Sequence, residues 1–226
     1  MSQRANASLS YSEEYYRLRH RSPAFHAELR WMSRLASPVP HARVLDVGCG
    51  AGALVTRLAE RGCLSVGVDT NEGALRLAQR AAVASIFVAG ASADHLPFSD
   101  DVFETVFAQH VIEHFEVPET LVKEWCRVLR PGGRLVLVTP NEQYPDPESY
   151  YDPTHYQIFS ARRLADLVRR EGMTVQTCRT LRPFILTRKL ELFTSFAAEW
   201  LQFLPPYHCR GASILLSALK PGSHSG

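Results

Sequence analysis

Short apolar runs and amphipathic segments alternate along the chain from residue 43 onward. The apolar runs, such as residues 43–47, have the length and composition of buried strands. The amphipathic segments place apolar residues three and four positions apart, as Leu54, Val55 and Leu58 show, which is typical of helices packed on one face. Strands are predicted at residues 43–47, 63–69, 85–90, 102–109, 134–140, 173–180 and 211–220, and helices at 52–62, 71–82, 118–133 and 160–172. This alternation predicts an α/β fold whose doubly wound, mostly parallel sheet carries helices on both faces.

Two further segments have helical periodicity. Within residues 11–36, Phe25, Leu29 and Met32 recur at helical spacing, while Glu28 lies elsewhere around the helix, so residues 1–40 are predicted to form a helical cap. Residues 182–210 separate the last two predicted strands and are rich in Phe and Leu. Their apolar spacing suits an inserted lid over a cleft, or a surface for a homodimer. Residues 1–226 are expected to form a single domain.

Composition narrows the range of functions. The 226 residues carry a formal net charge of +2, too small to indicate a nucleic-acid partner. The five cysteines are scattered and form no C-x-x-C, which favours reduced thiols in a cytoplasmic protein and gives no cysteine-based zinc site. Neither a signal-peptide core nor a membrane-spanning run of about 18 apolar residues is present, so no transmembrane segment is expected.

A glycine-rich loop follows the first predicted strand. Gly48, Gly50 and Gly52 stand between a strand and a helix, where glycine permits a tight turn and close approach of a ligand. Asp69 ends the next strand, 23 residues after Asp46, and a carboxylate there is placed to accept hydrogen bonds from ribose hydroxyls. This pair of features indicates a nucleoside-containing cofactor.

The same loop also satisfies the dinucleotide pattern G-x-G-x-x-G/A, so a nicotinamide-dependent oxidoreductase is an alternative. Asp46 argues against it, because a carboxylate directly before the glycines would repel a pyrophosphate and favour a cationic group such as an ammonium. In a purely structural role, the glycines would only form a turn, and Asp46 would cap the following helix.

Residues 110–114 raise another alternative, since His110, Glu113 and His114 match the H-x-x-E-H pattern of zinc proteases. That pattern needs both histidines on one face of a helix. The preceding residues 102–109 read as a strand, which places His110 at a strand end instead. The pattern is therefore read as accidental, and no metal is expected.

Four segments in order resemble the class I S-adenosylmethionine-dependent methyltransferases, in particular the type 11 small-molecule group. They are "VLDVGCGAGALV", "VGVDTNEGAL", "ASADHLPFSDDVFETVFAQHVIEHF" and "EWCRVLRPGGRLVLVTPN". The resemblance implies S-adenosylmethionine as cofactor and a sheet of seven strands in the order 3-2-1-4-5-7-6, with the seventh strand antiparallel. Two positions depart from the family pattern: Ser92 stands where an acidic residue is usual, and Glu104 where Asp is usual.

The resemblance also implies roles for individual residues. The aminoacyl end of the cofactor is implied to contact Asp46, Gly48, Cys49, Gly50 and Gly52. The ribose is implied to contact Asp69, Thr70 and Asn71. Ser92 and Ala93 are implied to contact the adenine, and Gln109 and His110 to lie under the methionine and its methyl group.

The acceptor is harder to predict. Methyl transfer from a sulfonium needs alignment above all, and a base only when the nucleophile is protonated. His155 lies in a long loop after the fifth strand and is the best candidate base, although it could instead cap the helix that begins near Ser160. His114 could face the acceptor as well.

We therefore expect methyl transfer to a small, partly apolar organic acceptor, with O-methylation slightly favoured. The alternatives are the nicotinamide-dependent oxidoreductase and a cofactor-binding regulatory partner without turnover. Tyr11, Tyr15 and Tyr16 could cover the cleft, but packing of the N-terminal helix is favoured for them.

Overall fold

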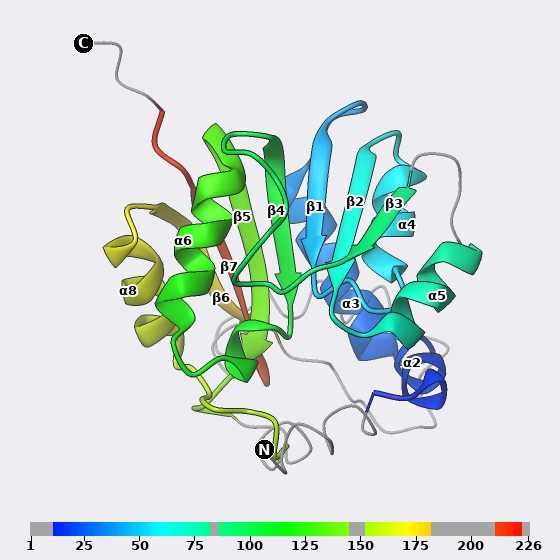
Figure 1. The fold of residues 1–226 in the computed structure, drawn as a ribbon. Coiled ribbons are helices and arrows are strands. Elements are labelled where there is room, and N and C mark those ends of the chain that lie inside the picture. The colour runs from blue at the N-terminus through cyan, green and yellow to red at the C-terminus, as the bar shows by residue number, and fades with distance from the viewer. Residues whose placement is uncertain (1–10, 82–85, 145–151, 182–210, 223–226) are drawn as a thin grey trace, which may run out of the picture.

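The computed structural model describes residues 11–81, 86–144, 152–181 and 211–222. Helices and strands alternate through most of this range (Figure 1). The strands are β1 (Arg43–Val47), β2 (Leu64–Asp69), β3 (Ile86–Gly90), β4 (Phe103–Gln109), β5 (Leu129–Pro140), β6 (Thr174–Leu181) and β7 (Ser213–Leu219). The helices are α2 (Glu13–Arg19), α3 (Pro23–Ala36), α4 (Ala53–Ala59), α5 (Glu72–Ala81), the short 3₁₀ turn η1 (Ile112–His114), α6 (Pro118–Val128) and α8 (Ala161–Arg170).

The strands form one sheet in the order β3-β2-β1-β4-β5-β7-β6, which confirms the predicted order. Every pairing from β3 across to β5 is parallel, and β7 pairs antiparallel with both β5 and β6. The parallel strands end together at the lower edge of the sheet in Figure 1, where α2 and η1 also lie. Ligands of open α/β sheets bind at this carboxyl edge.

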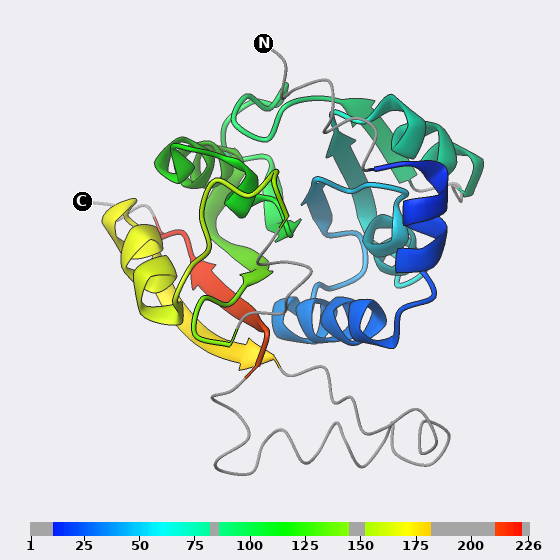
Figure 2. The ribbon, with the colours of Figure 1, turned by 90° about the horizontal axis from the view of Figure 1, so that it is seen from below.

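Alternate residues of the central strands pack into two separate cores, as the two-residue period of a strand requires. In β1, Val44 contacts the core beneath α3 and α4, whereas Leu45 contacts the core beneath α6 and α8. In β5, Val136 and Leu137 divide in the same way. Helices therefore cover both faces of the sheet, as Figure 2 shows from the carboxyl edge.

One predicted boundary was wrong. The helix predicted at residues 118–133 ends at Val128, and β5 begins at Leu129, five residues before the predicted strand. Pro131 explains the difference, since proline cannot continue a helix and disfavours helical backbone in the residue before it. The predicted cap of the last helix is confirmed, because the Ser160 hydroxyl accepts a hydrogen bond from the Arg163 backbone N–H.

The predicted helices of residues 11–36 are confirmed as α2 and α3, each capped by a serine hydroxyl. Helix α3 packs against β5 and β7, while α2 packs against α5 at the carboxyl edge (Figures 1 and 2). The predicted lid at residues 182–210 lies outside the described residues. Among the described residues, no helix is long and apolar enough to cross a membrane.

Candidate active site

The predicted glycine loop connects β1 to α4 at the carboxyl edge. Gly48, Gly50 and Gly52 have φ angles of +70°, +52° and +80°, a region that other residues seldom adopt. The backbone N–H groups of Gly48 and Cys49 both donate to the carbonyl of Val68, at 2.8 and 3.0 Å, which ties the loop to the end of β2. Glycine is needed here for backbone conformation.

Space is also restricted around the loop. A methyl group on Gly50 would come within 2.7 Å of the Tyr16 ring, and one on Gly48 would overlap the side chain of Val111. Tyr16 is itself buried in a small cluster with Ala51 and Ala74. The favoured packing role of this tyrosine is thus confirmed, although its ring covers the glycine loop.

Asp69 ends β2, and each of its carboxylate oxygens accepts a backbone hydrogen bond. Oδ2 accepts a hydrogen bond from the Gly50 N–H and Oδ1 accepts one from the Asn71 N–H, both at 2.8 Å. Burial raises the pKa of Asp69, although backbone hydrogen bonds from Asn71, Gly50 and Thr70 oppose the rise. Each oxygen keeps a lone pair for a ligand hydroxyl.

Asp46 is the most unusual group on this side of the site. Its side chain is 4% exposed, and within the described residues no group donates a hydrogen bond to its carboxylate. Burial raises its pKa well above the usual value, and the nearby Asp69 carboxylate raises it further. A buried carboxylate without a donor is costly, so this position suits a ligand that brings a cation or a donor.

The structure places the remaining predicted residues of this side without testing their contacts with a cofactor. The Cys49 thiol packs against Gly67, and burial raises its pKa far above the usual range, so it is neutral. The Asn71 side chain accepts from the Ala74 N–H at 3.0 Å and donates to the Tyr11 carbonyl at 3.1 Å. Thr70 is exposed. We refer to Asp46, the loop of residues 48–52, Asp69 and Asn71 as the glycine-loop half.

The predicted adenine turn after β3 is partly occupied by internal contacts. The Ser92 hydroxyl donates to the Asp94 carboxylate, and the carbonyl of buried Ala93 accepts from the Trp125 indole N–H at 3.0 Å. Neither contact tests whether these residues meet adenine, so that role remains a prediction.

A buried ionic network occupies the ends of β4 and β5. His110 follows β4 with a φ of +55°, so it lies at a strand end as predicted. Its Nε2 lies 3.0 Å from Glu28 Oε2, and its Nδ1 lies 3.2 Å from Glu113 Oε1. An imidazolium donates through both nitrogens, so this geometry fits a cation between two carboxylates.

The network sets the charge of its members. Burial alone would lower the pKa of His110, but Glu28 and Glu113 raise it to about 9. Burial alone would raise the pKa of Glu28, but His110 and three hydrogen bonds lower it to about 2. Near pH 7 both glutamates and His110 are therefore charged.

Side chains from distant parts of the chain complete this network. Gln109 Nε2 donates to Glu28 at 2.8 Å, and the Ser213 hydroxyl of β7 donates to the same carboxylate at 2.5 Å. The Thr139 hydroxyl of β5 donates to Glu113 at 3.0 Å. Glu28 was predicted to lie elsewhere around its helix than the apolar stripe, and the structure adds that its polar contacts are internal.

Two further histidines lie next to Glu113. The His114 and His155 ring centroids are 4.7 Å apart, although η1 and the loop after β5 carry them. His114 Nδ1 lies 3.2 Å from the Thr154 carbonyl and 3.1 Å from its hydroxyl. Burial lowers the pKa of His114, which favours its neutral form. We refer to Glu28, His110, Glu113, His114 and His155 as the histidine half.

Tyr11 connects the two halves. Its carbonyl accepts from Asn71, while its hydroxyl lies 3.5 Å from His114 Nε2. Burial raises the pKa of Tyr11 to about 12, so the hydroxyl keeps its proton. Sequence reasoning preferred packing alone for this residue, whereas the structure also places it across the site.

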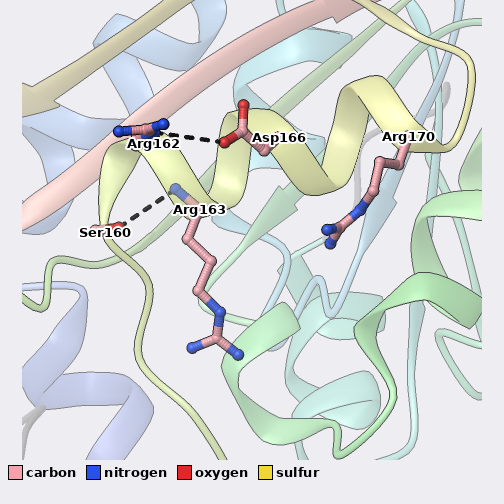
Figure 3. A pocket seen from close by; sticks show the side chains of 5 residues that line it. All are labelled: Ser160, Arg162, Arg163, Asp166 and Arg170. Carbon is pink, nitrogen blue, oxygen red and sulfur yellow. Dashed lines mark hydrogen bonds and ion pairs between the residues drawn. The ribbon is translucent and has the colours of Figure 1, made fainter.

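A hollow on the outer side of α8 is a less suitable site. Arg162, Arg163, Asp166, Arg170 and Ser160 line it (Figure 3). Arg162 pairs with Asp166 at 3.8 Å, and both side chains are largely exposed. The hollow offers surface charge without a buried reactive group, so the carboxyl edge remains the candidate active site.

Comparisons with known proteins agree with this location. Residues 45–137 match the family described as "Methyltransferase domain". A demethylmenaquinone methyltransferase of Thermus thermophilus is 34% identical over 157 residues, which cover 66% of this chain and 70% of that protein. The chain belongs to the class I S-adenosylmethionine-dependent methyltransferases of the type 11 group. The matched range contains the whole glycine loop, Asp69 and the end of β4.

Other members of this methyltransferase family are similar over different lengths. An uncharacterized methyltransferase of Mycobacterium bovis is 29% identical over 205 residues, covering 90% of this chain and 74% of that protein. A ubiquinone biosynthesis O-methyltransferase of Idiomarina loihiensis is 36% identical over 106 residues, covering 44% and 42%. The fold also matches that of a Haemonchus contortus phosphoethanolamine N-methyltransferase in complex with S-adenosyl-L-methionine, with a TM-score of 0.67 at 18% identity over 87% of this chain and 53% of that one.

The predicted site residues thus fall into two groups. Asp46, the glycine loop, Asp69 and Asn71 lie together at the ends of β1 and β2. His110, His114 and His155 converge at the end of β4, where sequence reasoning missed Glu28, Glu113 and Thr139 as their partners. The sequence gives little indication of these partners, since Glu28, for example, precedes His110 by 82 residues.

Proposed function

We propose that this methyltransferase transfers the methyl group of S-adenosylmethionine to a small, partly apolar organic acceptor, with an oxygen nucleophile favoured. The observation that carries the proposal is the buried Asp46 carboxylate, which lacks a donor among the described residues, directly precedes the glycine loop and lies close enough to Asp69 to feel its charge. S-adenosylmethionine brings an ammonium group and ribose hydroxyls, which fit these two carboxylates. When bound, the cofactor supplies an electrophilic methyl group on a sulfonium.

The glycine-loop half would hold the cofactor. Asp46 would accept hydrogen bonds from the ammonium, and the free lone pairs of Asp69 would accept from the ribose. The positive φ angles keep the loop backbone free of side chains on the ligand side. An oxidoreductase is less suited, because a pyrophosphate beside Asp46 and Asp69 would meet two carboxylates.

The histidine half would act on the acceptor. His155 and His114 are the two candidate catalytic residues, and neutral His114 has a ring nitrogen facing the Tyr11 hydroxyl. An acceptor hydroxyl could release its proton to His155 while its oxygen replaces the sulfur on the methyl carbon, so that the carbon–sulfur bond breaks and the cofactor would leave as a neutral thioether. His114 would then hold the acceptor by a hydrogen bond.

Related enzymes support a small aromatic or quinone-like acceptor. The similar proteins from Idiomarina loihiensis and Thermus thermophilus carry the names of ubiquinone and demethylmenaquinone biosynthesis. The predicted apolar segment at residues 182–210 suits such an acceptor. We place the reaction in the cytoplasm, with no nucleic acid as partner, and propose a homodimer through the same segment.

The test is mass-spectrometric detection of methylated products from a panel of phenols, hydroxyquinones and amines incubated with the enzyme and S-adenosylmethionine. Transfer to a phenolic or quinone hydroxyl is the expected result. Transfer only to amines would overturn the preference for oxygen. Cofactor binding without transfer to any acceptor would instead favour a regulatory partner.

A further inference from the structure

Three groups of the histidine half could bind one metal ion together. Glu113, His114 and His155 each offer one ligand atom, and these atoms all lie within 4.8 Å of one another. A metal that binds nitrogen and oxygen at about 2.0–2.2 Å brings its ligands somewhat closer than this, so small rotations of the side chains would complete the site. His110 takes no part, because both of its nitrogens bind glutamates.

The cluster is held in place by contacts between the two segments that carry it. The Glu113 carbonyl accepts from the backbone N–H groups of Tyr156 at 2.9 Å and Gln157 at 3.4 Å. These bonds fix the loop that carries His155 against η1. A site whose backbone is already fixed loses less entropy when an ion binds.

Each of two ligands also has a partner that orients it. His114 Nδ1 donates to the Thr154 carbonyl, which leaves Nε2 unprotonated and able to bind an ion. The Glu113 carboxylate is held by Thr139 and His110, and its oxygens keep further lone pairs. Partners of this kind fix the tautomer of a ligating histidine and the orientation of a ligating carboxylate.

We propose that Glu113, His114 and His155 form a binding site for one divalent transition-metal ion. Two imidazoles and one carboxylate are a donor set of catalytic Zn²⁺ sites, whereas Mg²⁺ prefers oxygen ligands alone. The site differs from the H-x-x-E-H reading, which required His110 and omitted His155. Asp152 lies 3.9 Å from His155 Nε2 and adds a second carboxylate nearby.

The ion would also refine the proposed reaction, and this part rests on the proposed function. The Tyr11 hydroxyl, 3.5 Å from His114 Nε2, marks a position beside the site that an acceptor hydroxyl could take. Coordination lowers the pKa of a bound hydroxyl, so the acceptor could release its proton to solvent water without His155 acting as base. Binding of the ion itself does not depend on this use.

The test is a titration of chelator-treated full-length enzyme with Zn²⁺ by calorimetry and with Co²⁺ by visible spectroscopy. One equivalent is expected to bind, with Co²⁺ d–d bands and no thiolate charge-transfer band. His155→Gln and His114→Gln are expected to weaken Zn²⁺ binding by at least about tenfold. Removal of a residue that only hydrogen-bonds to a metal ligand already weakens binding by about 10–100-fold, so removal of a ligand should cost no less. Thermal unfolding of each variant verifies that it is folded.

His41→Asn is the matched control, since His41 is exposed before β1, and Asn tolerates its φ of +67°. Its Zn²⁺ affinity should equal that of the unmodified enzyme. Absence of stoichiometric binding, or equal affinity in the folded His155→Gln and His114→Gln variants, would overturn the site. Neither result would affect the proposed methyl transfer, because titration with S-adenosylhomocysteine reports on the glycine-loop half separately.

Discussion

The glycine-loop half is built mainly from backbone, whereas the histidine half is built from side chains that four different segments contribute. In the first, Asp69 binds N–H groups of Gly50 and Asn71, all within two neighbouring strand–helix connections. In the second, Glu28 comes from α3, His110 follows β4, and His155 lies after β5. Backbone geometry leaves a pattern of glycines in the sequence, while a network of distant side chains leaves none. The first half should therefore govern cofactor affinity, and the second should govern turnover and stability.

The largest effect is expected from His155→Gln. If His155 is the general base, its loss should reduce kcat by about 10²–10⁴-fold. A similar reduction is expected if His155 instead binds a metal ion that activates the acceptor hydroxyl. Binding of S-adenosylhomocysteine should change little, because His155 is in the other half. Steady-state kinetics with the identified acceptor and calorimetry of the same preparation measure both quantities. Unchanged kcat would remove His155 from the reaction.

Asp69→Ala is the corresponding test of the glycine-loop half. It removes a carboxylate that would accept from the ribose and that binds the Gly50 and Asn71 N–H groups. Charged hydrogen bonds contribute about 1.5–3 kcal/mol each, so the Kd of S-adenosylhomocysteine should rise about 100-fold. A folded variant with unchanged Kd would show that the two halves are not divided as described.

Glu28→Gln tests the network that joins the N-terminal cap to the sheet. The amide keeps its shape but leaves the His110 imidazolium with one carboxylate fewer. Loss of a partner in a buried ionic network should lower the free energy of unfolding by about 2–3 kcal/mol, with little change in cofactor affinity. Urea denaturation measures the first quantity. Glu14→Gln, at an exposed position of α2, is the control.

Gly50→Ala tests whether the cap and the glycine loop are packed together. A left-handed φ costs alanine about 1–2 kcal/mol, and the new methyl group would meet the Tyr16 ring at 2.7 Å. In a double-mutant cycle, Tyr16→Leu should relieve part of this loss of stability. Strictly additive effects would mean that Tyr16 does not restrict the loop.

Asp46→Asn should give the smallest effect, and it should stabilise the ligand-free protein where the preceding two substitutions destabilise it. A raised pKa means that the folded, ligand-free protein binds a proton more tightly than the unfolded chain. Its stability therefore falls as pH rises from about 3.8. Asn does not titrate, so the stability of the variant relative to the unmodified protein should improve as pH increases from about 4 to about 8. Stability curves of the two proteins that run parallel between about pH 4 and pH 8 would contradict the assignment.

The difference between the two halves of the site also explains how much could be predicted from the sequence. The strand order, the helices of residues 11–36 and the Ser160 cap follow from periodicity, capping chemistry and the family resemblance, and all are confirmed. Helical periodicity did not indicate the contacts of Glu28, because charged side chains are mostly exposed and this one lies in a buried network. The contacts of His155 depend on how the loop after β5 folds, which no local pattern indicates.

The central claim is that the glycine-loop half binds the nucleoside cofactor of a methyltransferase. Its most direct test is calorimetric titration of the purified protein with S-adenosylhomocysteine and, separately, with NADH. The account predicts one saturable site for S-adenosylhomocysteine, whose Kd rises about 100-fold in Asp69→Ala, and no heat of binding for NADH. Saturable binding of NADH without binding of S-adenosylhomocysteine would contradict it.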